Sequence, residues 1–185
     1  MKKIIFLAFA LILFQNNYAQ KHFSAEILTG VGFNKNLTLV NESIENYNVF
    51  TTQVNANYQF NLYKKLFAET GIGAQWYFNS GDVGVSNFKS TSLHLNVPFI
   101  ISYPLFKKTS IGIGAALSNN KSFDDFDFRA NHNIRTSLLL KGAYILNSNF
   151  SLLLIAKQNL SNTPDLYLIN QPNFDVSVGI SYKIF

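Results

Sequence analysis

The chain has 185 residues and carries 15 Lys and Arg against 10 Asp and Glu, for a net charge of +5. It contains no Cys, 3 His and 1 Met, which excludes disulfide scaffolds, zinc–cysteine sites and cysteine catalysis. Charged residues make up 14% of the chain and aromatic residues 15%, so the surface is not the charged one of an ordinary soluble domain.

The first predicted element is a secretory signal peptide over residues 1–20. Two lysines precede an unbroken apolar run over 4–14, and Ala19 is a small residue at the expected cleavage position. The run is too short to span about 30 Å of hydrocarbon as a helix, which takes roughly 20 residues. Cleavage leaves a mature outer-membrane domain over 21–185 with a net charge of +3, so nucleic-acid binding is not expected.

From residue 22 onward the dominant hydrophobic period is two, which is typical of strands with one apolar face. In the clearest case, apolar side chains from Phe50 to Phe60 alternate with uncharged polar ones from Thr51 to Asn61. Pro98 lies within a strand pattern and donates no ladder hydrogen bond, so we expect a bulge or local break in pairing there. The predicted strands are 22–33, 49–61, 66–78, 89–103, 109–118, 132–145, 149–159 and 173–185.

The connections between these segments alternate in length. The long ones, rich in Asn, Ser and Asp, are 34–48, 79–88, 119–131 and 160–172. The short turns are 62–65, 104–108 and 146–148. An even strand count with both termini on the short-turn side is typical of bacterial membrane barrels. The sequence therefore predicts an all-β fold, an eight-stranded antiparallel up-and-down transmembrane β-barrel with its long loops facing outward.

The polar face of the strands distinguishes a membrane barrel from a soluble one. It carries Gly, Ser, Asn, Gln and Thr with few charges, which suits a crowded lumen, while the aliphatic face suits lipid. Leu139, Leu153 and Ile155 fall on the polar face and are expected to pack inside the barrel. A secreted soluble barrel or sandwich is the alternative.

Two aromatic girdles are predicted, a periplasmic one of Phe23, Tyr58, Phe60, Tyr103, Tyr144, Phe150 and Tyr182 and an outer one of Phe33, Phe50, Trp76 and Phe78.

The C-terminal segment also indicates export to the outer membrane. It alternates from Phe174 to Ile184 and the sequence ends on Phe185, which resembles the insertion signal read by the outer-membrane assembly machinery. Phe185 is out of phase with the apolar face, and Lys183 stands where the usual signal has a second aromatic residue. Outer-membrane lipid and, during biogenesis, this machinery are the expected partners.

Several stretches together resemble the small porin-like outer membrane protein β-barrel domain family. The strand 93–103 is similar to a family strand that ends in a leucine-x-isoleucine-proline pattern, and 111–117 matches a Gly-rich strand. The stretch 156–162 lies where the family often has an alanine-arginine-tyrosine run, and 179–182 is a similar closing strand. The resemblance implies a fold and an outer-membrane location, and no particular chemistry.

Threading the predicted strands places ionisable side chains in the lumen in two layers. The periplasmic layer holds Glu26, Glu69, Lys141 and Lys183, and the outer layer holds His94, Arg135, Lys157 and Asp175. The last strand pairs with both of its neighbours, so we expect Lys157 to meet Asp175 and Lys183 to meet Glu26. Because buried charges are costly unless paired, these side chains are expected to neutralise one another. The interior of an eight-stranded barrel is just wide enough for side chains, so a filled lumen is predicted rather than a pore.

A rim-located enzyme acting on lipid or peptide is the alternative function. It needs a nucleophile, a base and an orienting group in contact. His94 with Ser92 and Asp175, or His132 with Ser137 and a loop Asp, are the sets that the chain offers. Neither has distinctive spacing, so we predict a non-enzyme with no catalytic residue and no cofactor.

The connection at 119–129 is the exposed segment most suggestive of contact. Its candidate contact residues are Phe123, Asp124, Asp125, Phe126, Asp127 and Phe128. Calcium needs six to eight oxygens at defined spacing, and no EF-hand loop occurs here, so no metal site is predicted. The aromatic residues either pack on the barrel rim or meet a protein or other surface. The predicted function is a structural or surface-interaction role through the outer loops, with an accessory role in a secretion or envelope complex as a further alternative.

Overall fold

A computed structural model of the chain describes residues 22–33, 38–39, 42–83, 86–122, 134–160 and 172–184. The predicted signal peptide at 1–20 lies outside these residues. The strands are β1 (His22–Phe33), β2 (Thr38–Leu39), β3 (Glu42–Tyr63), β4 (Leu66–Val83), β5 (Ser86–Phe106), β6 (Thr109–Ser122), β7 (Ile134–Ile145), β8 (Phe150–Asn159) and β9 (Phe174–Lys183). Within the described ranges, no helix is long and apolar enough to cross a membrane.

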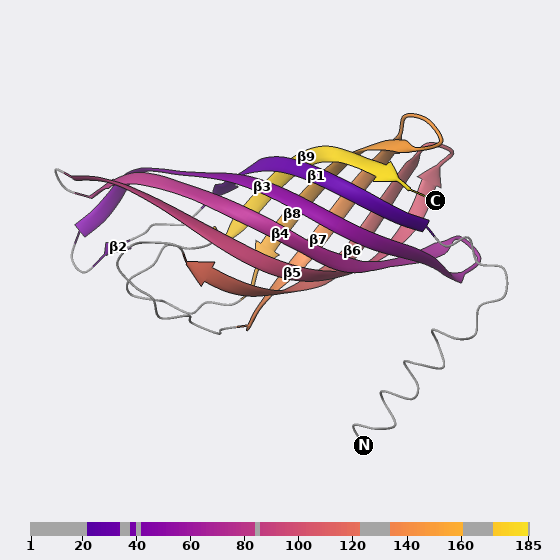
Figure 1. The fold of residues 1–185 in the computed structure, drawn as a ribbon, viewed down its shortest axis with the longest axis horizontal. Helices are drawn as coiled ribbons and strands as arrows, with labels where there is room; N and C mark the ends of the chain where they lie inside the picture. Colours follow the sequence, from indigo (N-terminus) through magenta and orange to yellow (C-terminus); the bar gives the residue numbers. More distant parts are fainter. Residues whose placement is uncertain are drawn as a thin grey trace, which may run out of the picture.

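The eight long strands form one closed antiparallel sheet. Each pairs with its neighbours in chain order, and β1 pairs with both β9 and β3, which closes the barrel (Figure 1). The two-residue strand β2 pairs with the start of β3 and is not one of the strands of the barrel wall. The predicted all-β fold, an eight-stranded antiparallel up-and-down barrel, is confirmed.

The barrel is taller on one side than the sequence pattern predicts. β3, β4 and β5 continue past the end of β1 at the side of the long connections (Figure 1). Val83 still pairs with Ser86, so the long connection predicted at 79–88 is wrong, and this segment is a β-hairpin. Strand segments outside the belt of exposed apolar side chains need no apolar face, so the period-two signal on which the prediction depended fades there.

At the opposite end the connections are short, as predicted. Two residues, Lys64 and Lys65, join β3 to β4, and Lys107 and Lys108 join β5 to β6. Lys64 takes a left-handed backbone conformation with a φ of 48°, which a tight hairpin turn requires.

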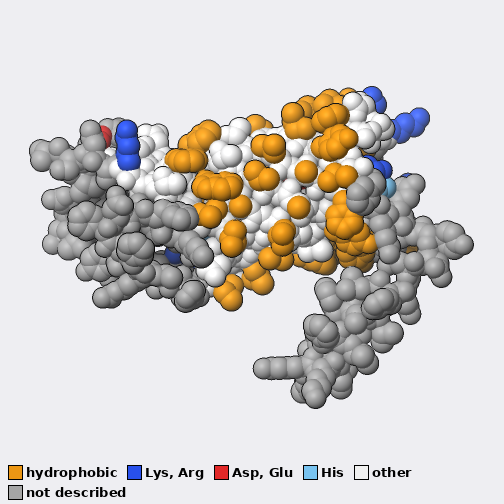
Figure 2. Space-filling model, in the orientation of Figure 1, with side chains coloured by type: hydrophobic (Ala, Val, Ile, Leu, Met, Phe, Trp, Pro, Cys, Tyr) orange, Lys and Arg blue, Asp and Glu red, His pale blue; other side chains and the backbone are white. Residues whose placement is uncertain are grey.

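The outward face of the strands is a belt of exposed apolar side chains. Figure 2 shows orange side chains spread over the whole height of the barrel wall among white atoms, and the Lys and Arg side chains visible there lie toward the two ends. Aromatic pairs flank the belt: Phe23 and Tyr58 have ring centroids 4.9 Å apart near the short turns, and Phe50 and Phe78 have centroids 6.1 Å apart near the other end. Phe60 stacks on Tyr58 but is buried rather than exposed.

Pro98 interrupts one ladder without shifting it. The pairing of β4 with β5 runs to Thr70 and Phe99 and resumes at Gly73 and Asn96 in the same register. The expected local break is therefore present, and no bulge accompanies it. The hydroxyl of Thr70 donates to the carbonyl oxygen of Pro98 at 3.0 Å, which satisfies an acceptor beside the gap.

The inward face combines an apolar patch with polar layers. Leu139, Leu153 and Ile155 pack together inside the barrel, as their place on the polar face of the pattern predicts. Leu28, Ile100 and Ala116 complete this buried cluster. Apolar side chains therefore fill part of the barrel interior, and the charged side chains lie in the remaining space.

Candidate functional site: the charged interior

Strict alternation along the strands points the charged residues into the barrel. Glu26 on β1 and Asp175 on β9 are buried, while the residues beside them in each strand are more exposed. Lys141 on β7 and Lys157 on β8 follow the same pattern. These four side chains, with Glu69 on β4, form the centre of the lumen.

The layer nearer the short turns is built on Lys141. Its Nζ lies 2.6 Å from Oε1 of Glu26 and 2.5 Å from Oε1 of Glu69. Asn55 donates to the other oxygen of Glu26 and Asn57 donates to Glu69, both at 3.1 Å. One ammonium thus holds two carboxylates from strands on the far wall, and neutral amides complete their hydrogen bonds. We name this group the Lys141 layer.

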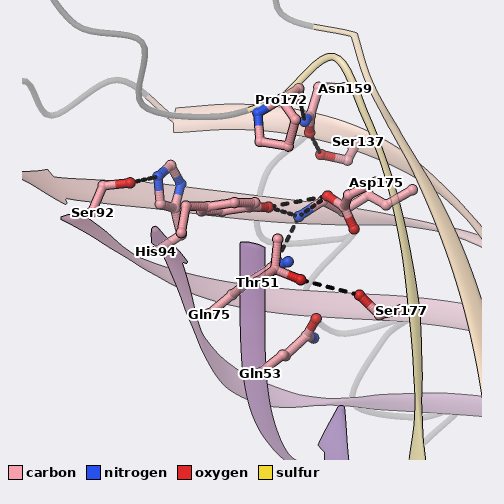
Figure 3. A network of polar contacts seen from close by, with 12 residues as sticks. Thr51, Gln53, Gln75, Ser92, His94, Ser137, Asn159, Pro172, Asp175 and Ser177 are labelled. Carbon is pink, nitrogen blue, oxygen red and sulfur yellow. Dashed lines mark hydrogen bonds and ion pairs between the residues drawn. The ribbon is translucent and has the colours of Figure 1, made fainter. Parts of the chain in front are cut away.

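The second layer, nearer the long connections, is built on Lys157. Its Nζ lies 3.3 Å from Oδ2 of Asp175 and donates to Oε1 of Gln75 at 2.6 Å and to the hydroxyl of Tyr77. Tyr77 in turn donates to Asp175 at 3.2 Å. Figure 3 shows Gln75 and Asp175 approaching from opposite walls. We name this group the Lys157 layer.

A ring of further polar side chains surrounds the Lys157 layer. The His94 ring packs edge-on against Tyr77 with centroids 4.9 Å apart, and its Nε2 lies 3.3 Å from Oγ of Ser92. Thr51 on β3 and Ser177 on β9 share a hydrogen bond of 3.3 Å across β1, which lies between these two strands (Figure 3). Arg135 is also buried on the inward face. The polar atoms therefore form an extended network, as low-dielectric interiors require.

Of the two expected ion pairs, the structure contains one and replaces the other with different contacts. Lys157 lies beside Asp175, because the two residues are register partners on the adjacent strands β8 and β9. Lys183, expected to meet Glu26, instead has its Nζ 3.2 Å from Nε2 of His22. Lys183 pairs in register with Ser24, closer to the barrel end, while Glu26 is held by Lys141 from across the lumen. The expected Lys183–Glu26 pair is therefore wrong.

Sequence reasoning missed several members of the network. Gln75, Tyr77, Asn55 and Asn57 all bond directly to the charged residues. All four have the inward parity of their strands, so the alternation could have found them. Tyr77 was the least apparent because aromatic residues in such patterns are mostly assigned to the lipid side.

Little space remains between the two layers. A void of about 20 Å³ lies there, lined by both layers and by apolar side chains such as Ile100 and Leu139. This is room for about one water molecule. At the short-turn end the lumen opens into a vestibule of about 340 Å³ whose inner surface includes Glu69 and Lys141.

The candidate catalytic set does not assemble at an accessible site. Ser92 and His94 are in contact but are 0% and 1% exposed. Asp175 is bonded to Lys157 and Tyr77. The second set depends on His132, which lies outside the described residues, as do the loop residues Phe123, Asp124, Asp125, Phe126, Asp127 and Phe128. Among the residues that the structure describes, no group of three or more His, Cys, Asp or Glu could hold a metal ion.

Comparison with known proteins gives structural likeness only. No family model and no curated protein matches the chain. A structure titled "De novo design of transmembrane beta-barrels" is 18% identical with a TM-score of 0.48, covering 88% of this chain and 95% of that one. An outer membrane channel from Pseudomonas putida F1 is 7% identical with a TM-score of 0.39, covering 91% and 97%. The translocator domain of autotransporter NalP from Neisseria meningitidis is 10% identical with a TM-score of 0.36, covering 98% and 94%.

At these identities and scores the likenesses carry no functional argument. The fold rests on the strand pairing described above. Membership of the porin-like family stays a prediction, since no family model supports it.

Proposed function

We propose that the chain is a small outer-membrane β-barrel protein with a lumen closed by its own side chains and a structural or surface-interaction role at its outer end. The observation that carries this proposal is the difference in polarity between the outward and inward faces of the barrel wall. Apolar side chains are exposed around the outside, and paired charges are buried inside. Hydrocarbon tolerates the first face, and only a sealed interior tolerates the second.

The filled lumen argues against conduction. Lys141 reaches across to Glu26 and Glu69, and Lys157 reaches across to Gln75 and Tyr77. The void of about 20 Å³ between them is too small for a hydrated ion path. The test is conductance across a planar bilayer with the refolded mature chain. We expect no stepwise openings, and reproducible unitary steps would overturn the closed lumen.

The tall side of the barrel supports a role at the surface. Beyond the end of β1, the strands β3, β4 and β5 continue as a paired extension at the side of the long connections. A paired extension of this kind offers a surface for contact with another protein.

Shortening this extension tests the surface role. A variant in which a two-residue turn replaces 81–88 keeps the membrane-spanning part of every strand. Cells displaying the full chain are expected to settle faster by aggregation than cells displaying the shortened variant. Equal settling rates at equal surface levels would contradict a contact through the extension. A rim enzyme gains no support from the buried Ser92 and His94.

A further inference from the structure

A groove of about 910 Å³ crosses the outward face of the barrel from β1, over β3, β4, β5 and β6, to the start of β7. The strand register arranges its outward side chains, all apolar except Asn119, in two rows that run perpendicular to the strands. One row is Ala25, Ala56, Ile72, Val97 and Leu117, and the other is Val54, Ala74, Leu95, Asn119 and Ile134.

Small side chains form the floor of part of the groove. Ala25 pairs directly with Ala56, and Ala74 pairs with Val54 in the next row. Larger side chains stand beside them, with Ile72 68% exposed. The alternation of small and large residues gives this region a concave shape within a belt that is otherwise covered by larger side chains.

Beneath the groove, two inward amide side chains fill the space at Gly73. Gly73 has no side chain, and a Cβ there would lie 2.1 Å from Oδ1 of Asn55 and 2.6 Å from Oδ1 of Asn96. Asn55 and Asn96 line both the outer groove and the inner void. The gap in the β4–β5 ladder at Pro98 lies at the same place. The groove is therefore a local feature of the sheet and not an average property of the belt.

The chemistry of the lining selects the occupant. The described residues that line the groove include no charged side chain, and the groove is continuous with the lipid-facing belt. Four inter-strand spacings make it about 19 Å long. Strands in such barrels tilt by about 35–45°, so the groove slopes through most of the ~15 Å of hydrocarbon in one leaflet. A flexible hydrocarbon chain fits a passage of this length and polarity.

We propose that the groove is a binding site for one acyl chain of a membrane phospholipid. Asn119 is an exposed polar side chain of the groove, close to the outer end of β6, and provides a donor near the level of lipid ester groups. This inference rests on the proposed membrane setting. A chain held here is ordered by the Ala25–Ala56 floor and exchanges with bulk lipid more slowly than its neighbours.

Trp76 lines the groove and is the only tryptophan in the chain, so its fluorescence reports occupancy. The refolded protein is held in detergent micelles and titrated with phosphatidylcholine brominated on its acyl chains. We expect quenching that saturates at a low mole fraction of lipid. Ala56→Phe fills the floor and is expected to weaken the apparent affinity by about tenfold, the factor for roughly two methylenes that lose contact.

The control is Ala156→Phe, an outward-facing alanine on β8 away from the groove. It is expected to quench like the parent protein. Quenching that rises linearly with lipid and is equal in both variants would overturn the site and leave lipid as bulk solvent. Dimerisation in detergent that Ala56→Phe abolishes would also overturn it, with a second copy as the occupant. A heat-dependent gel shift for every variant separates failure of the groove from failure of the membrane barrel.

Discussion

The outer and inner walls of the barrel are made by the same strands but follow different rules. Val54 and Asn55 are consecutive in β3, and they are 43% and 4% exposed. Val54 needs only to be apolar, whereas Asn55 must place its amide on Glu26 and beside Gly73. The outer wall is specified by polarity and the inner wall by individual partners. Substitutions should therefore be judged by which wall they touch.

The largest expected effect comes from breaking the Lys141 layer. Lys141→Met leaves Glu26 and Glu69 buried without their cation, which should lower the free energy of unfolding by about 3–5 kcal/mol. Urea titration of the protein in lipid vesicles measures this. Lys183→Met, at the barrel end, is the matched control and should cost much less. Equal losses would contradict the partner-specified inner wall, and combining Lys141→Met with Glu26→Gln and Glu69→Gln should recover most of the stability.

A charge on the outer wall should have the next largest effect. Val54→Arg places a guanidinium in the middle of the lipid-facing belt and should cost about 2–4 kcal/mol. The control is Ser102→Arg, which directs the same side chain into the open vestibule at the short-turn end. The same titration measures both variants. A loss at Ser102 as large as that at Val54 would show that the assignment of outer and inner faces is wrong.

A single methyl group should distinguish the walls on a finer scale. Gly73→Ala puts a Cβ within 2.1 Å of Oδ1 of Asn55 and should cost about 1–3 kcal/mol by displacing an amide that supports Glu26. Gly142→Ala is the control, since its Cβ would meet nothing closer than 3.9 Å. Equal stability of the two variants would mean that the interior relaxes more easily than its packing implies.

The smallest expected effect concerns the seam at Pro98. Thr70→Val removes the hydroxyl that donates to the Pro98 carbonyl and should cost about 0.5–1.5 kcal/mol. Thr52→Val, another outward threonine on the adjacent strand β3, provides the comparison. If neither substitution lowers the free energy of unfolding, the hydrogen bond from Thr70 to the Pro98 carbonyl makes no net contribution to stability, which would contradict this prediction.

The sequence predicted the fold because each long strand carries one apolar face, which leaves a period of two in the sequence. The ion pair of Lys157 with Asp175 was also predictable, since it joins adjacent strands and needs only their register. Lys141 contacts Glu26 across the lumen, and that contact depends on the stagger and closure of the barrel, which local alternation does not contain. The tall hairpin of β4 and β5 was missed because its tip carries no apolar period from which a strand could be predicted.

The most direct test of the account is the gel mobility of the mature chain, refolded in detergent and run with and without boiling. A closed barrel sealed by its Lys141 and Lys157 layers resists SDS until it is heated, so we predict a heat-dependent shift in mobility. One mobility under both conditions, with a β-rich circular dichroism spectrum in plain buffer, would contradict a membrane barrel with an apolar outer wall.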